Sequence, residues 1–226
     1  MHTIELRNIS KVIKNNIVLS NINYKFESGK VYGLKGRNGS GKSMLLRTIS
    51  GLIRPTSGSV IIDGKELHKE IESPGNIGIV VENAGLYPDF TGFYNLKYLA
   101  GIMGQISDDE IINAIKRVGL DLYDKKIVKK YSLGMKQKIV IAQAIMEKPD
   151  FLLLDEPTNA LDESGVKLLR EIVQEEATRG ALVIIASHNQ EDIELLCDKV
   201  IIMADGKISD EYVNSREMNL CSEETQ

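Results

Sequence analysis

Residues 36–43 have the types and the spacing from which chemistry can be predicted first. They are Gly36-Arg37-Asn38-Gly39-Ser40-Gly41-Lys42-Ser43, which fit the pattern G-x-x-x-x-G-K-[ST] of loops that bind nucleoside triphosphates. In such a loop the glycines let backbone N–H groups surround phosphate oxygens, Lys42 reaches the β- and γ-phosphates, and the Ser43 hydroxyl binds Mg²⁺. We expect nucleotide contacts from Gly36, Asn38, Gly39, Ser40, Gly41, Lys42, Ser43 and Met44.

The residues on either side of this loop have the order that phosphate binding requires. Residues 31–35 are predicted to form a buried strand that enters the loop, and residues 44–49 a helix that leaves it. The positive end of the helix dipole would then face the phosphates. A Gly/Ser-rich surface turn is the alternative interpretation of the short pattern alone, and the flanking elements argue against it.

A pair of acidic residues, Asp155 and Glu156, follows the apolar run 151–154. A strand buried on both faces ends at the carboxyl edge of a sheet, where open α/β sheets bind ligands. Asp155 would orient Mg²⁺ through water. Glu156 would polarise the water that attacks the γ-phosphate, which contributes about 10²–10⁴-fold to a rate. The alternative is a helix cap with Pro157 at an early helical position.

Two further segments have polar groups at the ends of predicted elements. Ser132 and Gly134 lie at the start of a predicted helix, where their N–H groups and the Ser132 hydroxyl could form a second anion site or only cap the helix. His188 follows the predicted strand 182–186 and would emerge at the same sheet edge as Asp155. A structural histidine at a strand end is the alternative.

The hydrophobic pattern predicts an α/β chain with an antiparallel front, a helical middle and a parallel sheet. The expected strands are 4–9, 17–26, 31–35, 59–62, 77–81, 151–154, 182–186 and 200–203, with a turn at Asn15-Asn16 and a closing hairpin at 205–208. The expected helices are 44–49, 94–103, 108–118, 136–146, 164–178 and 191–196.

Composition limits the possible partners and compartments. The 226 residues are enough for one large domain, and a net charge of −4 provides no basic field for nucleic acid, so no nucleic-acid partner is expected. Cys197 and Cys221 form no C-x-x-C pattern and no leader is visible, so we expect a cytoplasmic protein. No apolar run reaches the roughly 20 residues of a membrane-spanning helix, so another chain would have to span any membrane.

Several motifs resemble those of the ABC-transporter ATPases. Residues 131–137, Y-S-L-G-M-K-Q, resemble the S-L-G-M-K/R-Q variant of the family's L-S-G-G-Q signature. Residues 156–162, E-P-T-N-A-L-D, resemble its E-P-T-x-x-L-D run, and His188 is placed like its switch histidine. The motifs come in the order of the family, and the resemblance extends from the first strands to Lys207.

The resemblance implies a P-loop NTPase (RecA-like) core with an N-terminal antiparallel β subdomain and an inserted α-helical subdomain. The implied boundaries are about 86–148 for the insertion, 1–215 for the single ATPase domain and 216–226 for a short tail. The implied cofactors are ATP and Mg²⁺. The implied metal residues are Ser43, Glu82 and Asp155, and the implied catalytic residues are Glu156, His188 and Glu82.

The resemblance also implies partners. In the family, the signature of one subunit closes over nucleotide held by another, so we expect a head-to-tail homodimer in which Ser132 and Gly134 contact the second subunit's ATP. We expect an integral-membrane permease in another chain, docked near residues 83–94, and a peripheral location on the inner face of the cell membrane. A soluble, non-transport ABC ATPase that acts on a macromolecular complex is the alternative.

Three residues differ from the usual family pattern. Most members have Gln where this chain has Glu82, and a glutamate there could bind Mg²⁺ directly. This form resembles the lantibiotic and bacitracin-type subgroup, which implies export of a peptide antibiotic or a similar amphipathic compound. Ile13 replaces an aromatic residue that stacks on adenine, which predicts poor discrimination between ATP and GTP. Met44 replaces a common threonine and leaves only its N–H group for phosphate.

Overall fold

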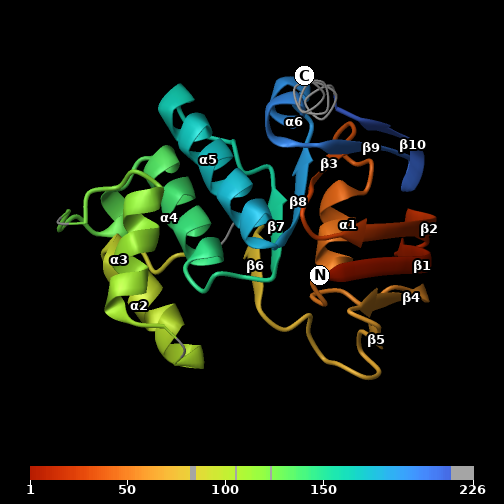
Figure 1. Cartoon of the computed structure of the whole chain (residues 1–226), viewed down its shortest axis with the longest axis horizontal. Helices are drawn as coiled ribbons and strands as arrows, with labels where there is room; N and C mark the ends of the chain where they lie inside the picture. Colours follow the sequence, from red (N-terminus) through yellow and green to blue (C-terminus); the bar gives the residue numbers. More distant parts are fainter. Residues whose placement is uncertain (82–84, 105, 123, 215–226) are drawn as a thin grey trace, which may run out of the picture.

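The computed structural model describes residues 1–81, 85–104, 106–122 and 124–214. The predicted metal and catalytic residue Glu82 and the predicted tail 216–226 lie outside the described residues. The described chain forms two β-sheets with helices between and around them (Figure 1). The α/β character predicted from the hydrophobic pattern is therefore confirmed.

The larger sheet contains the strands that surround the phosphate loop. Its strand order is β10-β9-β3-β8-β7-β6, with parallel pairing from β9 to β6 and an antiparallel hairpin between β9 and β10. Its strands are β3 (Val31–Lys35), β6 (Ile77–Val80), β7 (Phe151–Asp155), β8 (Leu182–Ser187), β9 (Lys199–Ala204) and β10 (Lys207–Val213). Because β3, β8 and β7 are neighbours, the chain leaves them at one common edge.

The smaller sheet is antiparallel, with strand order β2-β1-β4-β5. Its strands are β1 (Thr3–Ile13), β2 (Asn16–Glu27), β4 (Ser57–Ile62) and the short β5 (Lys65–Glu66). The β1–β2 turn consists of Lys14 and Asn15, with φ of 46° and 67°, as a type I′ hairpin requires. The predicted turn at Asn15-Asn16 was therefore wrong by one residue, because Asn16 already pairs with Ile13.

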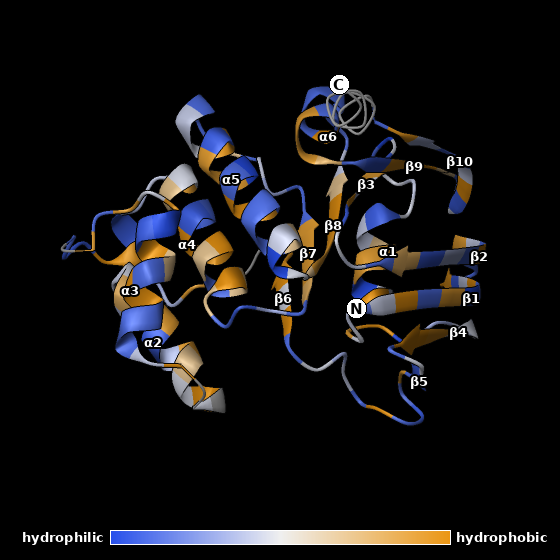
Figure 2. Ribbon diagram, in the orientation of Figure 1, coloured by the Kyte–Doolittle hydropathy of each residue, from blue (hydrophilic) through white to orange (hydrophobic). Residues whose placement is uncertain are grey.

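Helix α1 (Lys42–Ile49) lies between the two sheets (Figure 1). Its Leu45, Leu46 and Ile49 are buried among side chains of both sheets, which form one hydrophobic core. The other core covers the opposite face of the larger sheet. Residues of β7 and β8 alternate between these cores, so the strands are hydrophobic at nearly every position, as Figure 2 shows for β6 to β8.

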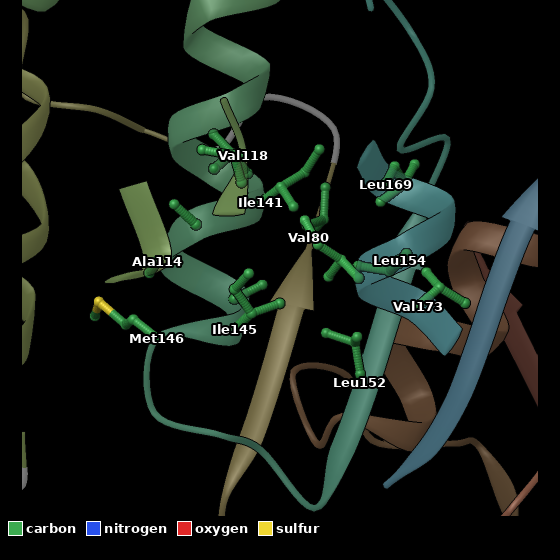
Figure 3. Close-up of a cluster of buried hydrophobic side chains, with 14 of the residues drawn as sticks. Val80, Ala114, Val118, Ile141, Ile145, Met146, Leu152, Leu154, Leu169 and Val173 are labelled. Carbon is green, nitrogen blue, oxygen red and sulfur yellow. The ribbon is translucent and has the colours of Figure 1, made fainter. Parts of the chain in front are cut away.

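Three helices lie together beyond β6: α2 (Gly92–Met103), α3 (Asp108–Arg117) and α4 (Leu133–Ile145). Helices α5 (Glu163–Arg179) and α6 (Gln190–Leu196) cover the same face of the larger sheet as the second core. Figure 3 shows Ile141 and Ile145 of α4 packed with Val80 of β6 and with Leu169 of α5. This packing fixes α4, and with it the signature residues, against the sheet.

The predicted helices are all present, and the largest difference in a start is at α4. The helix begins at Leu133 instead of residue 136, because Ser132 is its N-cap and accepts a hydrogen bond from the Met135 N–H, 3.2 Å away. A capping box begins α3, with Ser107 as the N-cap and Glu110 as its acidic member. In the described residues, every helix is too short or too polar to cross a bilayer.

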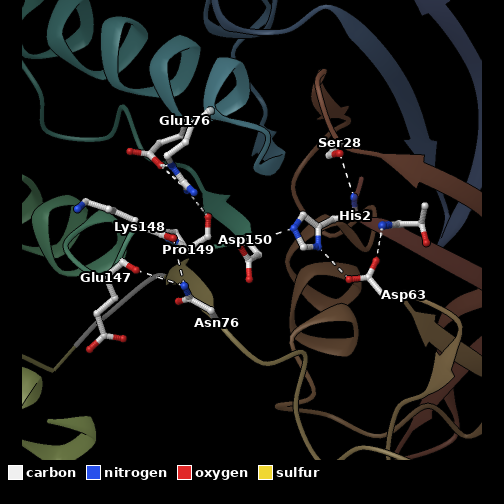
Figure 4. A network of polar contacts seen from close by, with 11 residues as sticks. His2, Ser28, Asp63, Asn76, Glu147, Lys148, Pro149, Asp150 and Glu176 are labelled. Atoms are coloured by element: carbon white, nitrogen blue, oxygen red, sulfur yellow. Dashed lines mark hydrogen bonds and ion pairs between the residues drawn. The ribbon is translucent and has the colours of Figure 1, made fainter. Parts of the chain in front are cut away.

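A polar network ties the N-terminus to both sheets (Figure 4). The His2 imidazole lies 2.9 Å from Asp63, which follows β4, and 3.6 Å from Asp150, which precedes β7. The His2 N–H donates to the Ser28 hydroxyl, 3.0 Å away. These contacts hold the start of β1 and the end of β4 against the start of β7, which is a structural role.

Candidate functional site

The phosphate loop connects β3 to α1 and lines a hollow of about 360 Å³. Its wall consists of Asn38, Gly39, Ser40, Gly41, Lys42, Ser43 and Met44, together with Val18, Glu156, Asn159 and His188. Gly36 does not line this hollow. A Cβ on Gly36 would lie 2.4 Å from the Met203 carbonyl oxygen and 2.5 Å from Ser40 Oγ, so only glycine fits where the loop passes the end of β9.

Lys42 places a nearly buried positive charge at the centre of the loop, with a side chain only 5% exposed. Its Nζ donates hydrogen bonds to the carbonyl oxygens of Gly36 and Arg37, at 2.7 and 3.4 Å. The same Nζ lies 3.9 Å from Glu156 Oε1. An ammonium group held there attracts anions, and a triphosphate is the anion that the surrounding N–H groups suit.

Ser43 and Asp155 form a pair of oxygen ligands beside Lys42. Ser43 Oγ donates to Asp155 Oδ1, 3.0 Å away, and Asp155 is 3% exposed. Burial raises the pKa of Asp155, and the Glu156 charge adds to this, whereas the Ser43 hydrogen bond acts in the opposite direction. Hydroxyl and carboxylate oxygens suit Mg²⁺, which commonly takes one or two carboxylates plus substrate phosphates. Among the described residues, no group of three or more His, Cys, Asp or Glu could hold a metal alone.

Glu156 and His188 meet at the same edge, as predicted. His188 Nδ1 lies 2.9 Å from Glu156 Oε2, and the His188 backbone N–H donates to Glu156 Oε1 at 3.0 Å. Ser187 Oγ donates to Glu156 Oε2 at 3.2 Å. The Glu156 backbone has a φ of 48°, the left-handed region, and its N–H donates to the Ala186 carbonyl oxygen. The carboxylate is therefore held by several contacts at the mouth of the hollow.

The predicted signature residues Ser132 and Gly134 lie apart from the phosphate loop. They are absent from the wall of its hollow, and Gly134 instead approaches the neighbouring loop, since a Cβ there would lie 2.7 Å from the Ala160 carbonyl oxygen. A second hollow of about 460 Å³ connects this helix start to Asp155 and Glu156 through Lys136 and Gln137. Within one chain, the two predicted anion sites are thus separate.

The comparison with known families identifies the chain. Residues 19–159 match the family described as "ABC transporter". This chain belongs to the ABC transporter family. It is 53% identical over 205 residues to the "Uncharacterized ABC transporter ATP-binding protein YybJ" of Bacillus subtilis (strain 168), a match that covers 91% of this chain and 94% of the relative.

Other relatives of this ABC protein have names that include a transported compound. The lantibiotic transport ATP-binding protein SrtF of Streptococcus pyogenes is 37% identical, over 91% of this chain and 88% of the relative. The bacitracin transport ATP-binding protein BcrA of Enterococcus faecalis is 36% identical, over 96% of this chain and 71% of the relative. The family and fold are thus shared with proteins that are named for transport.

Solved structures share the fold of this ABC protein. "Dimeric Structure of MJ0796, a Bacterial ABC Transporter Cassette" superposes with a TM-score of 0.84 at 24% identity, over 93% of this chain and 98% of that chain. "Structure of ATP binding subunit of ABC transporter" gives 0.84 at 25% identity, over 97% and 93%. These findings confirm the predicted P-loop NTPase fold, and the chain is an ATP-binding subunit with ATPase activity.

Sequence reasoning missed three residues of the ABC site. Ser187 contacts the Glu156 carboxylate, and its position directly before His188 at a strand end was an available signal. Asn159 lies in the E-P-T-N-A-L-D run and lines both hollows. No sequence pattern marks Val18 as a site residue, because it reaches the loop from β2 through contact between the two sheets.

Proposed function

We propose that this chain hydrolyses Mg²⁺-ATP at a site shared by two copies and thereby drives export by a separate integral-membrane permease. The observation that carries the proposal is that Lys42, Glu156 and His188 line one hollow beside the phosphate loop. Asp155 accepts a hydrogen bond from Ser43 in the wall of that hollow. The exported molecule would be a peptide antibiotic or a similar amphipathic compound, in line with the names of SrtF and BcrA.

Each residue has a role that its contacts support. The N–H groups of residues 38–44 and the Lys42 ammonium bind and neutralise the phosphates. Ser43 and Asp155 would hold Mg²⁺, which would supply positive charge against the phosphates. Glu156 accepts a proton from the attacking water and His188 positions that water and the γ-phosphate. We include Glu82 in this proposal as a further residue that binds Mg²⁺ and takes part in catalysis.

The second copy supplies the other half of the site. Ser132 and Gly134 present a helix start that does not reach the phosphate loop of their own chain, so we infer that they contact ATP held by a partner copy. An isolated copy then binds nucleotide but hydrolyses it slowly. In this arrangement residues 1–215 form one ATPase domain, with the helical part at about 86–148 carrying the signature.

The permease would dock where aromatic side chains are exposed. Tyr87, Phe90 and Tyr98 pack against one another in tilted and edge-to-face pairs, with ring centroids 5.0–6.2 Å apart, and remain 39–52% exposed. Asn95, fully buried, holds the Tyr87 backbone by accepting from its N–H and donating to its carbonyl oxygen. A rigid exposed aromatic cluster suits a protein interface. The chain would accordingly lie on the inner face of the cell membrane as a peripheral subunit.

Purification from detergent-solubilised membranes, followed by mass spectrometry of the bound chains, tests the proposal. We expect a chain with several membrane spans, and co-purification with ribosomes or DNA instead would contradict it. The variant Phe90→Ser should recover less of that chain. Ile17→Ser is a matched control, because Ile17 is 66% exposed in the β1–β2 hairpin, so it should recover the wild-type amount.

A further inference from the structure

Asp192 lies on α6 and makes a hydrogen bond that joins the two segments carrying Glu156 and His188. The Thr158 hydroxyl donates to Asp192 Oδ2 at 2.6 Å, and Asp192 is 8% exposed. Thr158 follows Glu156 by two residues, and α6 begins two residues after His188. A short bond to a buried carboxylate is among the stronger side-chain hydrogen bonds.

This bond closes a ring of contacts around Glu156. On one side, Ser187 Oγ and the His188 backbone N–H donate to the Glu156 carboxylate. Ser187 Oγ also accepts from the Asn189 N–H at 3.1 Å, and Asn189 caps α6 by accepting from the Glu191 N–H. On the other side, Asp192 of α6 accepts from the Thr158 hydroxyl, and Thr158 is two residues from Glu156 along the chain.

The Asp192 carboxylate does not make the local hydrogen bond that is common at its position in a helix. Asp192 is the third residue of α6, and an acidic residue there commonly accepts from the backbone N–H of the N-cap. Here the N–H of the N-cap, Asn189, donates to Ser187 Oγ instead, and Asp192 reaches Thr158, 34 residues away in sequence. The Asp192 carboxylate therefore fixes the segment after Glu156 and does not cap the start of α6.

The backbone conformation of Glu156 needs contacts such as these to hold it. Its φ of 48° is unfavourable for a residue with a side chain, and such a conformation persists only where surrounding contacts hold it. Gln137 Nε2 donates to the Pro157 carbonyl oxygen at 3.0 Å, and the bond to Asp192 ties the same segment to α6. Without that bond, the segment after Glu156 loses its connection to the helix that follows His188. The carboxylate can then move relative to the γ-phosphate, and a displacement of about 1 Å can reduce a rate by about 10²-fold.

We propose that Asp192 is a positioning residue that, through Thr158, holds Glu156 and His188 in the geometry needed for ATP hydrolysis. The inference rests on the proposed role of Glu156 as the residue that activates water. Asp192 itself touches neither nucleotide nor water in this proposal. It acts on the rate of the chemical step and leaves nucleotide binding, which the phosphate loop provides, unchanged.

Steady-state hydrolysis and equilibrium nucleotide binding of the full chain, in its complex with the permease, test the proposal. Thr158→Val and Asp192→Ala should each lower kcat by about 10- to 100-fold, with KM and the Kd for ATP nearly unchanged. The lost bond to a buried carboxylate should lower the melting temperature by several degrees, which leaves both variants folded at the assay temperature. Their double variant should be no slower than either single one, because both remove the same bond. Asp192→Asn, which keeps an acceptor oxygen, should restore most of the rate.

Tyr24→Phe is the matched control, because it removes a similar bond, 2.7 Å long, from the Tyr24 hydroxyl to the Glu211 carboxylate on the outer strands β2 and β10. Its kcat should equal the wild-type value. A wild-type kcat in folded Thr158→Val, or additive losses in the double variant, would overturn the proposal. If Asp192→Ala does not fold, the kcat values of Thr158→Val and Asp192→Asn test the proposal. Wild-type hydrolysis by Glu156→Gln would instead overturn the proposed function.

Discussion

Replacement of Gly36 by alanine tests whether the phosphate loop needs its close contact with the end of β9. The added methyl group would lie 2.4 Å from the Met203 carbonyl oxygen, whereas Cβ atoms essentially never approach closer than 3.0 Å. The loop must therefore move by at least 0.6 Å, the difference between the two. Met203 cannot yield easily, because β9 is paired with both β3 and β10.

Two magnitudes follow from that displacement. Overpacking of this kind costs about 1–3 kcal/mol of unfolding free energy, and each kcal/mol lowers the melting temperature of a domain of this size by about 2–4 °C. The moved loop also misaligns the N–H groups that face the phosphates. Loss of one hydrogen bond to a charged group, about 1.5–3 kcal/mol, raises the Kd for ATP by roughly 10- to 100-fold.

Thermal unfolding and titration with a fluorescent ATP analogue measure both effects. Gly101→Ala is the matched control, because a Cβ there meets no atom within 4 Å and alanine favours the helix that contains it. The control should keep the Kd and gain slightly in stability. If Gly36→Ala binds ATP with the wild-type Kd and unfolds at the wild-type temperature, the steric reasoning is wrong.

Three further changes have expected outcomes. The raised pKa of Asp155 means that the folded state disfavours its charge, so Asp155→Asn, which removes that charge, should raise the melting temperature of the nucleotide-free chain while abolishing Mg²⁺-dependent hydrolysis. Asn95→Ala removes both bonds to the Tyr87 backbone, which should cost about 1–3 kcal/mol in urea unfolding and reduce permease recovery. Glu176→Ala leaves Arg117 and Arg179 without their shared buried carboxylate, and should cost about 1.5–3 kcal/mol in the same assay.

The sequence was sufficient to predict that part of the site would lie at one edge of the larger sheet. Asp155 ends β7, and Lys42 and His188 lie beyond the ends of β3 and β8; these strands run parallel, so their carboxyl ends meet at one edge. Strand pairing therefore converts positions that are distant in sequence into neighbours in space. The family resemblance added the role of His188 and the use of the signature by a second subunit, and both stay proposals.

Other features depend on contacts that no local pattern encodes. Val18 reaches the phosphate loop from the second sheet, and the Thr158–Asp192 bond joins residues 34 positions apart. The start of α4 was predicted three residues late, because the hydrophobic period begins inside the helix whereas the cap at Ser132 sets its true start. Tertiary contacts and caps thus account for the part of the site that sequence reasoning did not reach.

ATP hydrolysis by Glu156→Gln, measured beside its ATP binding, tests the central claim most directly. The substitution keeps the size of the side chain and leaves it within hydrogen-bond distance of Ser187 and His188. It removes the carboxylate that accepts a proton. We expect the Kd for ATP to stay within about twofold and kcat to fall about 10²–10⁴-fold. A Glu156→Gln chain that hydrolyses ATP at the wild-type rate would contradict the account.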